Sequence, residues 1–128
     1  MDPLFLTLDE VLSLHEDQIR RYGGSGGVRD LGLLESAMGT VMATFGGSFL
    51  HGSVLEMAAA YLFHISRNHP FMDGNKRTAV AAALTFLEMN GIEVDAKEKE
   101  FYELVIGVAE GKVTKAAVAV FFEEHRSP

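Results

Sequence analysis

The sequence predicts an all-α protein of about six helices, two of them buried and central. Patterns that open a helix, in which Ser, Thr or Asp precedes an apolar-periodic run, recur along the chain. Alternation typical of strands does not stand out. Two of the runs are apolar on nearly all sides, as in helices enclosed by others. The 128 residues, 48% of them apolar, fit a single domain spanning residues 1–128.

The first two helices are expected on either side of a glycine-rich segment. Residues 7–10 form a capping box that opens the first helix, and Gly23 would end it. Asp30 would cap a second helix that runs to about Ala43. We interpret residues 23–27 as a loop between these two helices rather than as a linker between domains.

The two central helices are expected at residues 54–68 and 75–90. A glycine-containing loop, residues 45–52, precedes the first of them, and Ser53 opens a second capping box. Pro70 should end this helix, because proline disfavours helical backbone in the residue before it. Both central helices are apolar on most sides, so we expect them to be buried.

Two shorter helices complete the prediction. Asp95 would cap a helix that reaches about Glu110. Thr114 would cap the last helix, with Val118, Phe121 and Phe122 on its inner side.

Charge and composition narrow the classes of partner and location. The formal net charge of −7 makes broad binding to nucleic-acid phosphates unexpected and favours a basic partner. The chain has no cysteine, which excludes disulfides and thiolate metal sites and is compatible with a reducing cytosol. No secretory signal is recognisable, and no apolar run approaches the ~20 residues that span a bilayer. We therefore expect a cytoplasmic protein without membrane contact.

The segment from His69 to Arg77, between the two central helices, concentrates chemically active side chains. Lys76 and Arg77 fall in the first turn of a helix, where the helix dipole disfavours cations. An external anion would remove this conflict, because free backbone N–H groups and both cations would then surround a phosphate. Gly74 would allow the backbone to approach closely.

Two further side chains of this segment complete a catalytic set. Asp73 provides the carboxylate that Mg²⁺ prefers beside bound phosphates. His69 is suited to take a proton from a hydroxyl near neutral pH. Phe71 is interpreted as an apolar anchor of the loop. The combination predicts phosphoryl or nucleotidyl transfer.

The same residues carry a family resemblance. The run HPFMDGNKR, residues 69–77, is similar to the signature of the Fic/Doc superfamily. Residues 14–24, LHEDQIRRYGG, and residues 84–91, LTFLEMNG, resemble segments of the death-on-curing (Doc) toxins in that superfamily. The resemblance implies a helical Fic fold in which the two central helices flank the active-site loop.

The Doc branch implies a particular reaction. Fic adenylyltransferases typically have glycine at the position of Lys76 and arginine at that of Val80, whereas the residues present here resemble Doc. The resemblance implies a kinase, within a type II toxin–antitoxin system, that moves the terminal phosphate of ATP to a threonine of elongation factor Tu and arrests translation and growth. It implies His69 as the base, Asp73 as the Mg²⁺ ligand, and phosphate contacts from Gly74, Asn75, Lys76 and Arg77.

Two alternatives stay open. Pro70 and Gly74 are as in Fic proteins, where Doc differs, and Ala81 replaces a polar residue, so transfer of AMP to a protein hydroxyl remains an alternative. A non-catalytic binding module is a second alternative, although the complete motif disfavours it. Arg21 and Arg67 occupy positions where Doc-like chains carry arginine, which implies that both could line the cleft.

Regulation is expected to come from a partner. Many Fic enzymes carry an inhibitory helix with Ser or Thr four residues before Glu-Gly or Glu-Asn. Glu110 is followed by glycine here, but the residue four before it is Ile106. The resemblance therefore implies a small Phd-like antitoxin whose C-terminal segment folds into a groove, and which binds DNA in place of this chain.

The other histidines are not expected to form a second site. His15, His51, His64 and His125 lack the spacing of a helical metal site. His15 and His64 are expected to be hydrogen-bonded histidines of the core.

Overall fold

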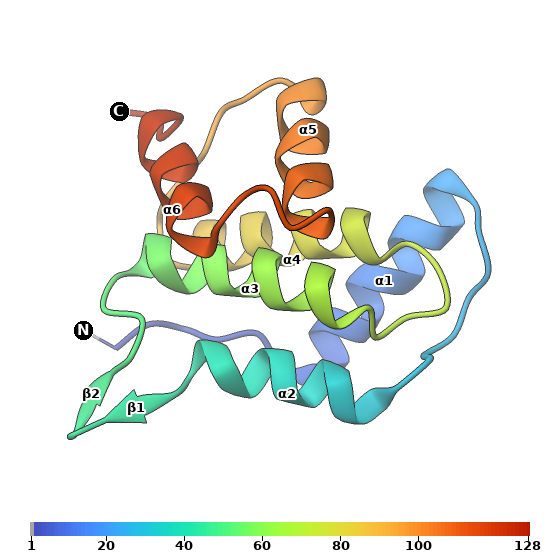
Figure 1. The fold of residues 1–128 in the computed structure, drawn as a ribbon, viewed down its shortest axis with the longest axis horizontal. Coiled ribbons are helices and arrows are strands. Elements are labelled where there is room, and N and C mark those ends of the chain that lie inside the picture. Colours follow the sequence, from blue (N-terminus) through green and yellow to red (C-terminus); the bar gives the residue numbers. More distant parts are fainter. Residues whose placement is uncertain (1) are drawn as a thin grey trace.

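A computed structural model describes residues 2–128 of the chain. These residues form six helices and one short hairpin (Figure 1). The helices are α1 (Leu8–Tyr22), α2 (Leu31–Val41), α3 (Val54–Asn68), α4 (Asn75–Met89), α5 (Glu98–Ala109) and α6 (Lys115–Glu124), and the strands are β1 (Thr44–Phe45) and β2 (Ser48–Phe49). The all-α prediction is confirmed, as is the number of helices.

Helix α3 is the centre of the fold. Figure 1 shows it crossing the middle of the molecule, with α2 along one side and α5 and α6 on the other. It packs against α2, α4, α5 and α6, while α4 also contacts α1. The buried side chains of α3 include five consecutive small and large apolar residues, 58–62. Since α3 and α4 are both buried and adjacent, the loop that joins them is held between the two most enclosed elements.

Local capping sets most helix starts where the sequence places them. In α1 the Thr7 hydroxyl accepts from the Glu10 N–H at 3.2 Å, and the Glu10 carboxylate accepts from the Thr7 N–H at 2.8 Å. Asp30, Ser53 and Thr114 each accept a hydrogen bond from the backbone N–H three residues on. A cap of this kind contributes about 1 kcal/mol to stability.

The hairpin was not foreseen. Residues 45–52 were predicted to be a loop, but β1 pairs antiparallel with β2 across a turn at Gly46 and Gly47. Both glycines have positive φ, 60° and 84°, as the tightest hairpin turns require. Strands of two residues are too short to show an alternating pattern and cannot be recognised from the sequence.

The start of α5 was predicted wrongly. Asp95 is not its cap, because α5 begins at Glu98 after Lys97. The Asp95 N–H instead donates to the carbonyl of His125 at 2.8 Å, and Val94 forms an antiparallel bridge with Arg126. A contact with the far end of the chain therefore overrides a local capping signal. Within residues 2–128, no helix combines the length and apolar character needed to cross a membrane.

Candidate active site

The loop between α3 and α4 has an unusual backbone. His69, the residue that ends α3, has φ 54° and ψ 53°, which is left-handed helical backbone. It is the one non-glycine residue with positive φ among those described. Such a conformation costs a residue with a Cβ roughly 1–2 kcal/mol, so neighbouring contacts must hold it. Gly74 at the other end of the loop has φ 75°, which glycine adopts without that cost.

An aromatic anchor holds the middle of the loop. Phe71 is fully buried, and its ring stacks on that of His15 with centroids 3.8 Å apart and planes within 6°. His15 Nε2 also lies 2.8 Å from the carbonyl oxygen of Asp73. The prediction that His15 is a hydrogen-bonded core histidine is confirmed, and the structure adds that it supports the loop.

Asn75 links the loop to the imidazole of His69. Its Oδ1 accepts from the Phe71 N–H at 2.9 Å, and its Nδ2 donates to the Phe71 carbonyl at 3.0 Å. The same Nδ2 lies 3.2 Å from His69 Nδ1. The side chain is buried, and both of its N–H donors have partners. In this geometry Asn75 organises the loop rather than facing a phosphate.

The imidazole of His69 consequently has one occupied and one outward nitrogen. Because Asn75 Oδ1 already accepts from the Phe71 N–H, its Nδ2 faces His69 Nδ1 and makes it an acceptor. The neutral ring then carries its proton on Nε2. His69 is an exposed residue, so this edge of the ring is open to a substrate.

Asp73 is an exposed carboxylate held by backbone donors. Hydrogen bonds from the Gly74 N–H at 2.9 Å and the Ser25 N–H at 3.2 Å hold the pKa of the Asp73 carboxyl below its usual range. The group is therefore ionised at neutral pH. Each oxygen accepts one bond and retains capacity for another. These features fit a ligand for a hard cation.

The beginning of α4 is arranged to receive an anion. Gly74 supplies no side-chain cap, and the first turn contains no acidic residue. Lys76 and Arg77 are half-buried in this turn. Arg77 Nη2 donates to the carbonyl of Gly23 at 3.0 Å, and its guanidinium lies 5.4 Å from the centre of the Tyr22 ring. Uncapped N–H groups and two cations at a helix N-terminus together favour a phosphate.

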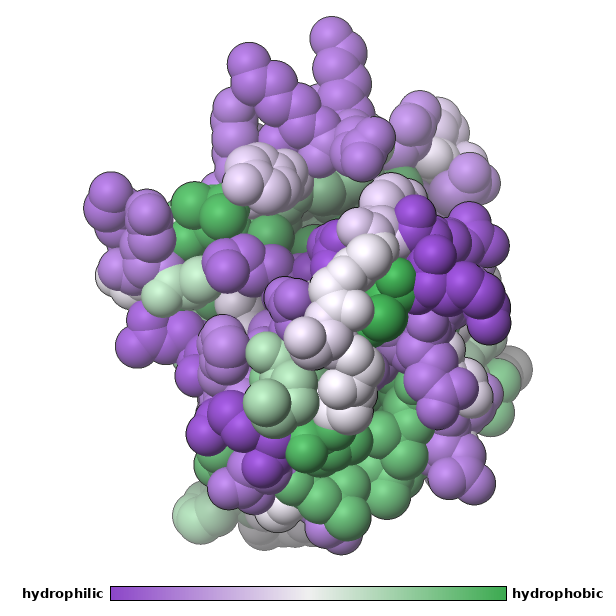
Figure 2. Space-filling model, turned by 90° about the vertical axis from the view of Figure 1, so that its right-hand side faces the viewer, coloured by the Kyte–Doolittle hydropathy of each residue, from purple (hydrophilic) through white to green (hydrophobic). Residues whose placement is uncertain are grey.

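The glycine-rich loop between α1 and α2 lies along the loop between α3 and α4, residues 69–74, which we call the motif loop. Val28 forms an antiparallel bridge with Phe71, and the Met72 N–H donates to Gly27 at 3.1 Å. At Gly24 an added Cβ would lie 2.6 Å from Asp73 Oδ2 and would displace that carboxylate, and the φ of 111° also favours glycine here. Figure 2 shows a pale band, the colour of residues of intermediate hydropathy, crossing this side of the molecule between polar and apolar areas. The predicted loop between helices is confirmed, but its role beside the motif was not foreseen.

Sequence reasoning missed Arg29 altogether. Its Nε donates to the carbonyl of His69 at 2.7 Å and its Nη2 to that of Asn68 at 3.1 Å. These partners are about 40 residues away in the chain, and no local pattern indicates them. Arg29 is therefore recognised only from the structure.

The two arginines expected to line the cleft contact other groups. Arg21 pairs with Asp17 one helical turn earlier, at 2.9 Å, and is mostly exposed. Arg67 Nη1 donates to the carbonyl of Val108 at 3.2 Å, at the end of α5. The structure does not bring either guanidinium into contact with the loop, and their cleft-lining role stays a prediction.

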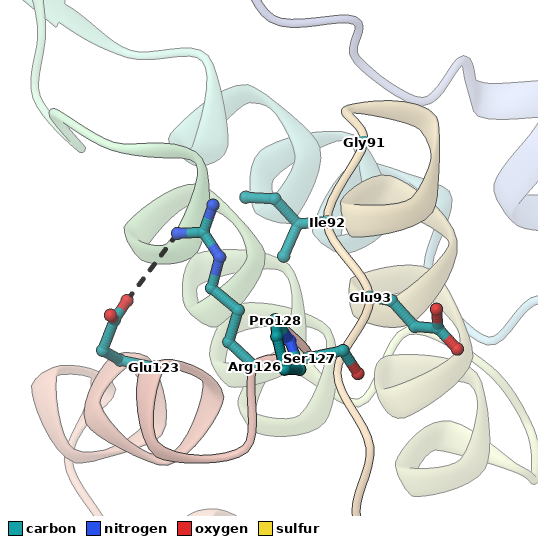
Figure 3. A pocket seen from close by; sticks show the side chains of 7 residues that line it. All are labelled: Gly91, Ile92, Glu93, Glu123, Arg126, Ser127 and Pro128. Carbon is teal, nitrogen blue, oxygen red and sulfur yellow. Dashed lines mark ion pairs between the residues drawn. The ribbon is translucent and has the colours of Figure 1, made fainter.

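A surface pocket elsewhere lacks comparable chemistry. Figure 3 shows it between the chain that follows α4 and the C-terminal segment, where Glu123 and Arg126 form an ion pair at 4.0 Å. Its lining is Gly91, Ile92, Glu93, Glu123, Arg126, Ser127 and Pro128. None of these belongs to the motif loop, so the loop remains the candidate site.

Comparison with known proteins agrees with this choice. Residues 5–87 match the model of the Fic/DOC family, and this range contains the whole motif loop. The chain is 38% identical over 111 residues to "Protein kinase doc" of Escherichia phage P1, which covers 87% of this chain and 86% of the relative. It is 47% identical over 75 residues to "Toxin Doc" of Mycolicibacterium smegmatis, which covers 59% of this chain and 58% of that relative.

Proposed function

Because this chain belongs to the Fic/DOC family, we propose that it is a toxin that transfers the terminal phosphate of ATP to a protein threonine. Elongation factor Tu is the proposed target, and arrest of translation and growth is the proposed consequence. Support comes from the relatives, whose names include "Toxin Doc" and "Protein kinase doc". The proposed reaction makes the chain a phosphotransferase.

One observation carries this proposal: an imidazole and a carboxylate stand beside an uncapped, cationic helix start. His69 and Asp73 are exposed as the first and fifth residues of a six-residue loop, and α4 begins after Gly74. Phosphoryl transfer depends mainly on positioning and on charge stabilisation, which these groups can provide. The side chains of Phe71, His15 and Asn75 keep the loop in place, and the phosphate contact expected of Asn75 stays a prediction.

In the proposed reaction His69 receives the proton of the threonine hydroxyl. A base must present an unprotonated nitrogen, and in the structure Nδ1 is turned toward Asn75. The outward Nε2 can accept a proton only once the neutral ring holds its own proton on Nδ1. We therefore include a change of tautomer as a step of the proposed cycle: Nε2 loses its proton to solvent and Nδ1 gains one from solvent. The ring keeps its position in this step, and only the hydrogen bond from Asn75 Nδ2 is lost.

ATP and Mg²⁺ are the proposed nucleotide substrate and metal cofactor. Asp73 would hold the ion, and Gly74, Lys76 and Arg77 would hold phosphates through backbone and side-chain donors. Among the described residues no three His, Cys, Asp or Glu side chains cluster as a metal site. In phosphate-transfer sites Mg²⁺ takes one or two carboxylates and completes its shell with phosphate oxygens and water. When bound, the ion would neutralise negative charge on the phosphates.

Transfer of phosphate rather than of AMP is supported by Lys76. The lysine brings charge and volume to a position in the first turn of α4 where adenylyltransferases of the family typically have glycine. Pro70 and Gly74 remain features shared with Fic proteins, so the assay must separate the two products.

The proposed restraint on this toxin is a small Phd-like antitoxin whose C-terminal segment folds into a groove. We propose that the antitoxin, rather than this acidic chain, binds DNA. We also propose that residues 1–128 act as one Fic/Doc domain. The family match ends at residue 87, but α5 and α6 beyond it pack on α3, which supports a common unit.

The test is the intact mass of purified elongation factor Tu after incubation with the protein, ATP and Mg²⁺. A gain of one phosphate that disappears with His69→Ala is the expected result. A gain of one nucleotide unit would move the protein to the adenylyltransferases. No change in mass would contradict elongation factor Tu as the target, and the same measurement on whole lysate would then seek another acceptor.

A further inference from the structure

We propose that Arg29 is a positioning residue that holds His69 in its strained backbone conformation and thereby sets the orientation of the imidazole. Its catalytic consequence rests on the proposed function, whereas its effect on the His69 ring does not. Arg29 comes from the loop between α1 and α2, outside the motif of residues 69–77. It touches the backbone of the loop rather than the outward edge of the imidazole.

Three consecutive carbonyls at the end of α3 are bound by this one residue. The Arg29 guanidinium donates through Nη2 to Asn68 at 3.1 Å and through Nε to His69 at 2.7 Å. The Arg29 backbone N–H donates to Pro70 at 2.7 Å, and the N–H of Asp30 shares that acceptor at 2.9 Å. The path of the chain from residue 68 to residue 70 is therefore specified by a single side chain and its own backbone.

His69 needs such support because its backbone is unfavourable for any residue with a Cβ. At φ 54° the residue would relax to the right-handed or extended region if nothing opposed it. Relaxation would rotate the peptide between His69 and Pro70, and the His69 carbonyl would leave the Arg29 Nε. The imidazole would move with the backbone, away from its 3.2 Å contact with Asn75 Nδ2.

The charge of the Arg29 guanidinium stabilises the same backbone conformation as its hydrogen bonds do. The last carbonyls of a helix carry partial negative charge, so a guanidinium at the end of α3 is favoured there. Two N–H groups of one planar head contact two successive carbonyls, which an ammonium cannot reproduce with the same spacing. We therefore expect lysine at position 29 to restore the charge but only part of the positioning.

The proposed phosphate site lies at the start of α4, whereas Arg29 lies in the loop between α1 and α2. Gly74, Lys76 and Arg77 belong to the start of α4, and Arg29 has no hydrogen bond to them among residues 2–128. Loss of Arg29 should then disturb the imidazole while leaving nucleotide binding almost intact. This separation predicts a lower kcat with little change in KM for ATP.

The experiment compares Arg29→Gln and Arg29→Lys with two matched controls. Thr114→Ala removes the cap of α6 far from the loop and serves as a variant of reduced stability. Arg126→Gln removes an exposed cation paired only with Glu123. For each protein we would measure thermal stability, kcat and KM for ATP with elongation factor Tu, and the ¹⁵N resonances of the His69 ring.

For Arg29→Gln we expect kcat per folded molecule to fall about tenfold or more, with KM for ATP within about twofold. We expect Arg29→Lys to be intermediate, and the His69 ring resonances to shift in both variants. Activity of Arg29→Gln equal to that of Thr114→Ala at matched stability would overturn the proposal. A raised KM with unchanged kcat would also overturn it, because Arg29 would then act on the nucleotide.

The two proposals can fail separately. If the wild-type protein transfers nothing to any acceptor, the proposed function is wrong and the ring resonances decide the role of Arg29. Resonances of His69 that are identical in wild type and Arg29→Gln would then overturn the positioning role. Shifted resonances, with those of Arg126→Gln unchanged, would support it.

Discussion

Two regions of the molecule place imidazoles near cations, and they differ in whether the imidazole and the cation contact each other. In the motif loop the outward edge of His69 is exposed and the cations at the start of α4 face no acidic residue in its first turn. Between α3 and α6, Lys115 Nζ instead contacts His51 Nε2 at 2.9 Å and His64 Nε2 at 3.1 Å. The second cluster pairs similar residue types with one another, although the buried His51 Nδ1 has no hydrogen-bond partner among the described residues.

The two regions differ because the groups of the second cluster are partly or fully buried, whereas His69 is exposed. Burial, followed by the charge of Lys115, lowers the pKa of His64 to about 4 and lowers that of His51 as well. Burial also lowers the pKa of Lys115. Both imidazoles are therefore neutral acceptors for one ammonium at neutral pH, which is a structural role. The motif loop instead leaves capacity for an external ligand.

The largest expected effect is that of His69→Ala on activity. Loss of the base should reduce phosphate transfer about 10²- to 10⁴-fold, while the melting temperature stays near that of the wild type because His69 is exposed. His64→Ala should show the reverse pattern, with a lower melting temperature and retained activity per folded molecule. Transfer rates and thermal unfolding of both variants are the measurements. Full activity of His69→Ala would remove His69 from the role of base.

Lys76→Gly should have the next largest effect. Removal of a cation from the start of α4 is expected to lower phosphate transfer about a hundredfold and to allow transfer of AMP to appear. Lys112→Gly is the matched control, because it removes an exposed lysine that follows α5 and pairs with Glu110. Mass spectrometry of the acceptor separates the two products. Unchanged phosphorylation in Lys76→Gly would contradict the assignment of Lys76.

Lys115→Met tests the cluster formed by Lys115, His51 and His64. Two half-buried or buried imidazoles would lose their donor, which should lower the free energy of unfolding by about 1–3 kcal/mol. Activity per folded molecule should not change. Chemical denaturation and the transfer assay are the measurements. An equal loss of activity would show that this cluster acts on the active site.

The smallest expected effect is a dependence of stability on pH that originates in this cluster. His64 titrates near 6.5 when unfolded and near 4 when folded, so its contribution is complete above pH 6.5 and is lost as pH falls toward 4. With a discount for partial exposure, the loss should be about 1 kcal/mol. Glu56 opposes the effect at His51, and the raised pKa of His125 opposes it overall.

Denaturation at pH 7 and pH 4.5, in wild type and in Lys115→Met, measures this effect. The variant should show the weaker dependence, because the charge of Lys115 contributes to the lowered pKa of both histidines. An identical dependence in the two proteins would place its origin outside the cluster.

The sequence predicts what local chemistry decides. Thr7, Asp30, Ser53 and Thr114 cap helices as expected, because each cap needs only the next three residues. The burial of α3 and α4 also follows from their apolar composition.

Contacts between distant segments could not be predicted. The bond from Asp95 to His125 displaced the start of α5, and Arg29 reaches His69 across 40 residues. The motif indicated the residues of the candidate site, but only the structure shows that the buried amide of Asn75 serves Phe71 and His69. Local pattern identifies the chemical groups, while tertiary packing assigns their orientation.

We propose that the motif loop transfers the terminal phosphate of ATP, and the position of the label in ATP can test this. The most direct measurement compares ATP labelled at the γ-phosphate with ATP labelled at the α-phosphate, each incubated with the protein, Mg²⁺ and elongation factor Tu. We predict that the γ label, and not the α label, becomes covalently bound to the acceptor, and that His69→Ala abolishes this. An acceptor that retains the α label, or neither label, would contradict transfer of the terminal phosphate.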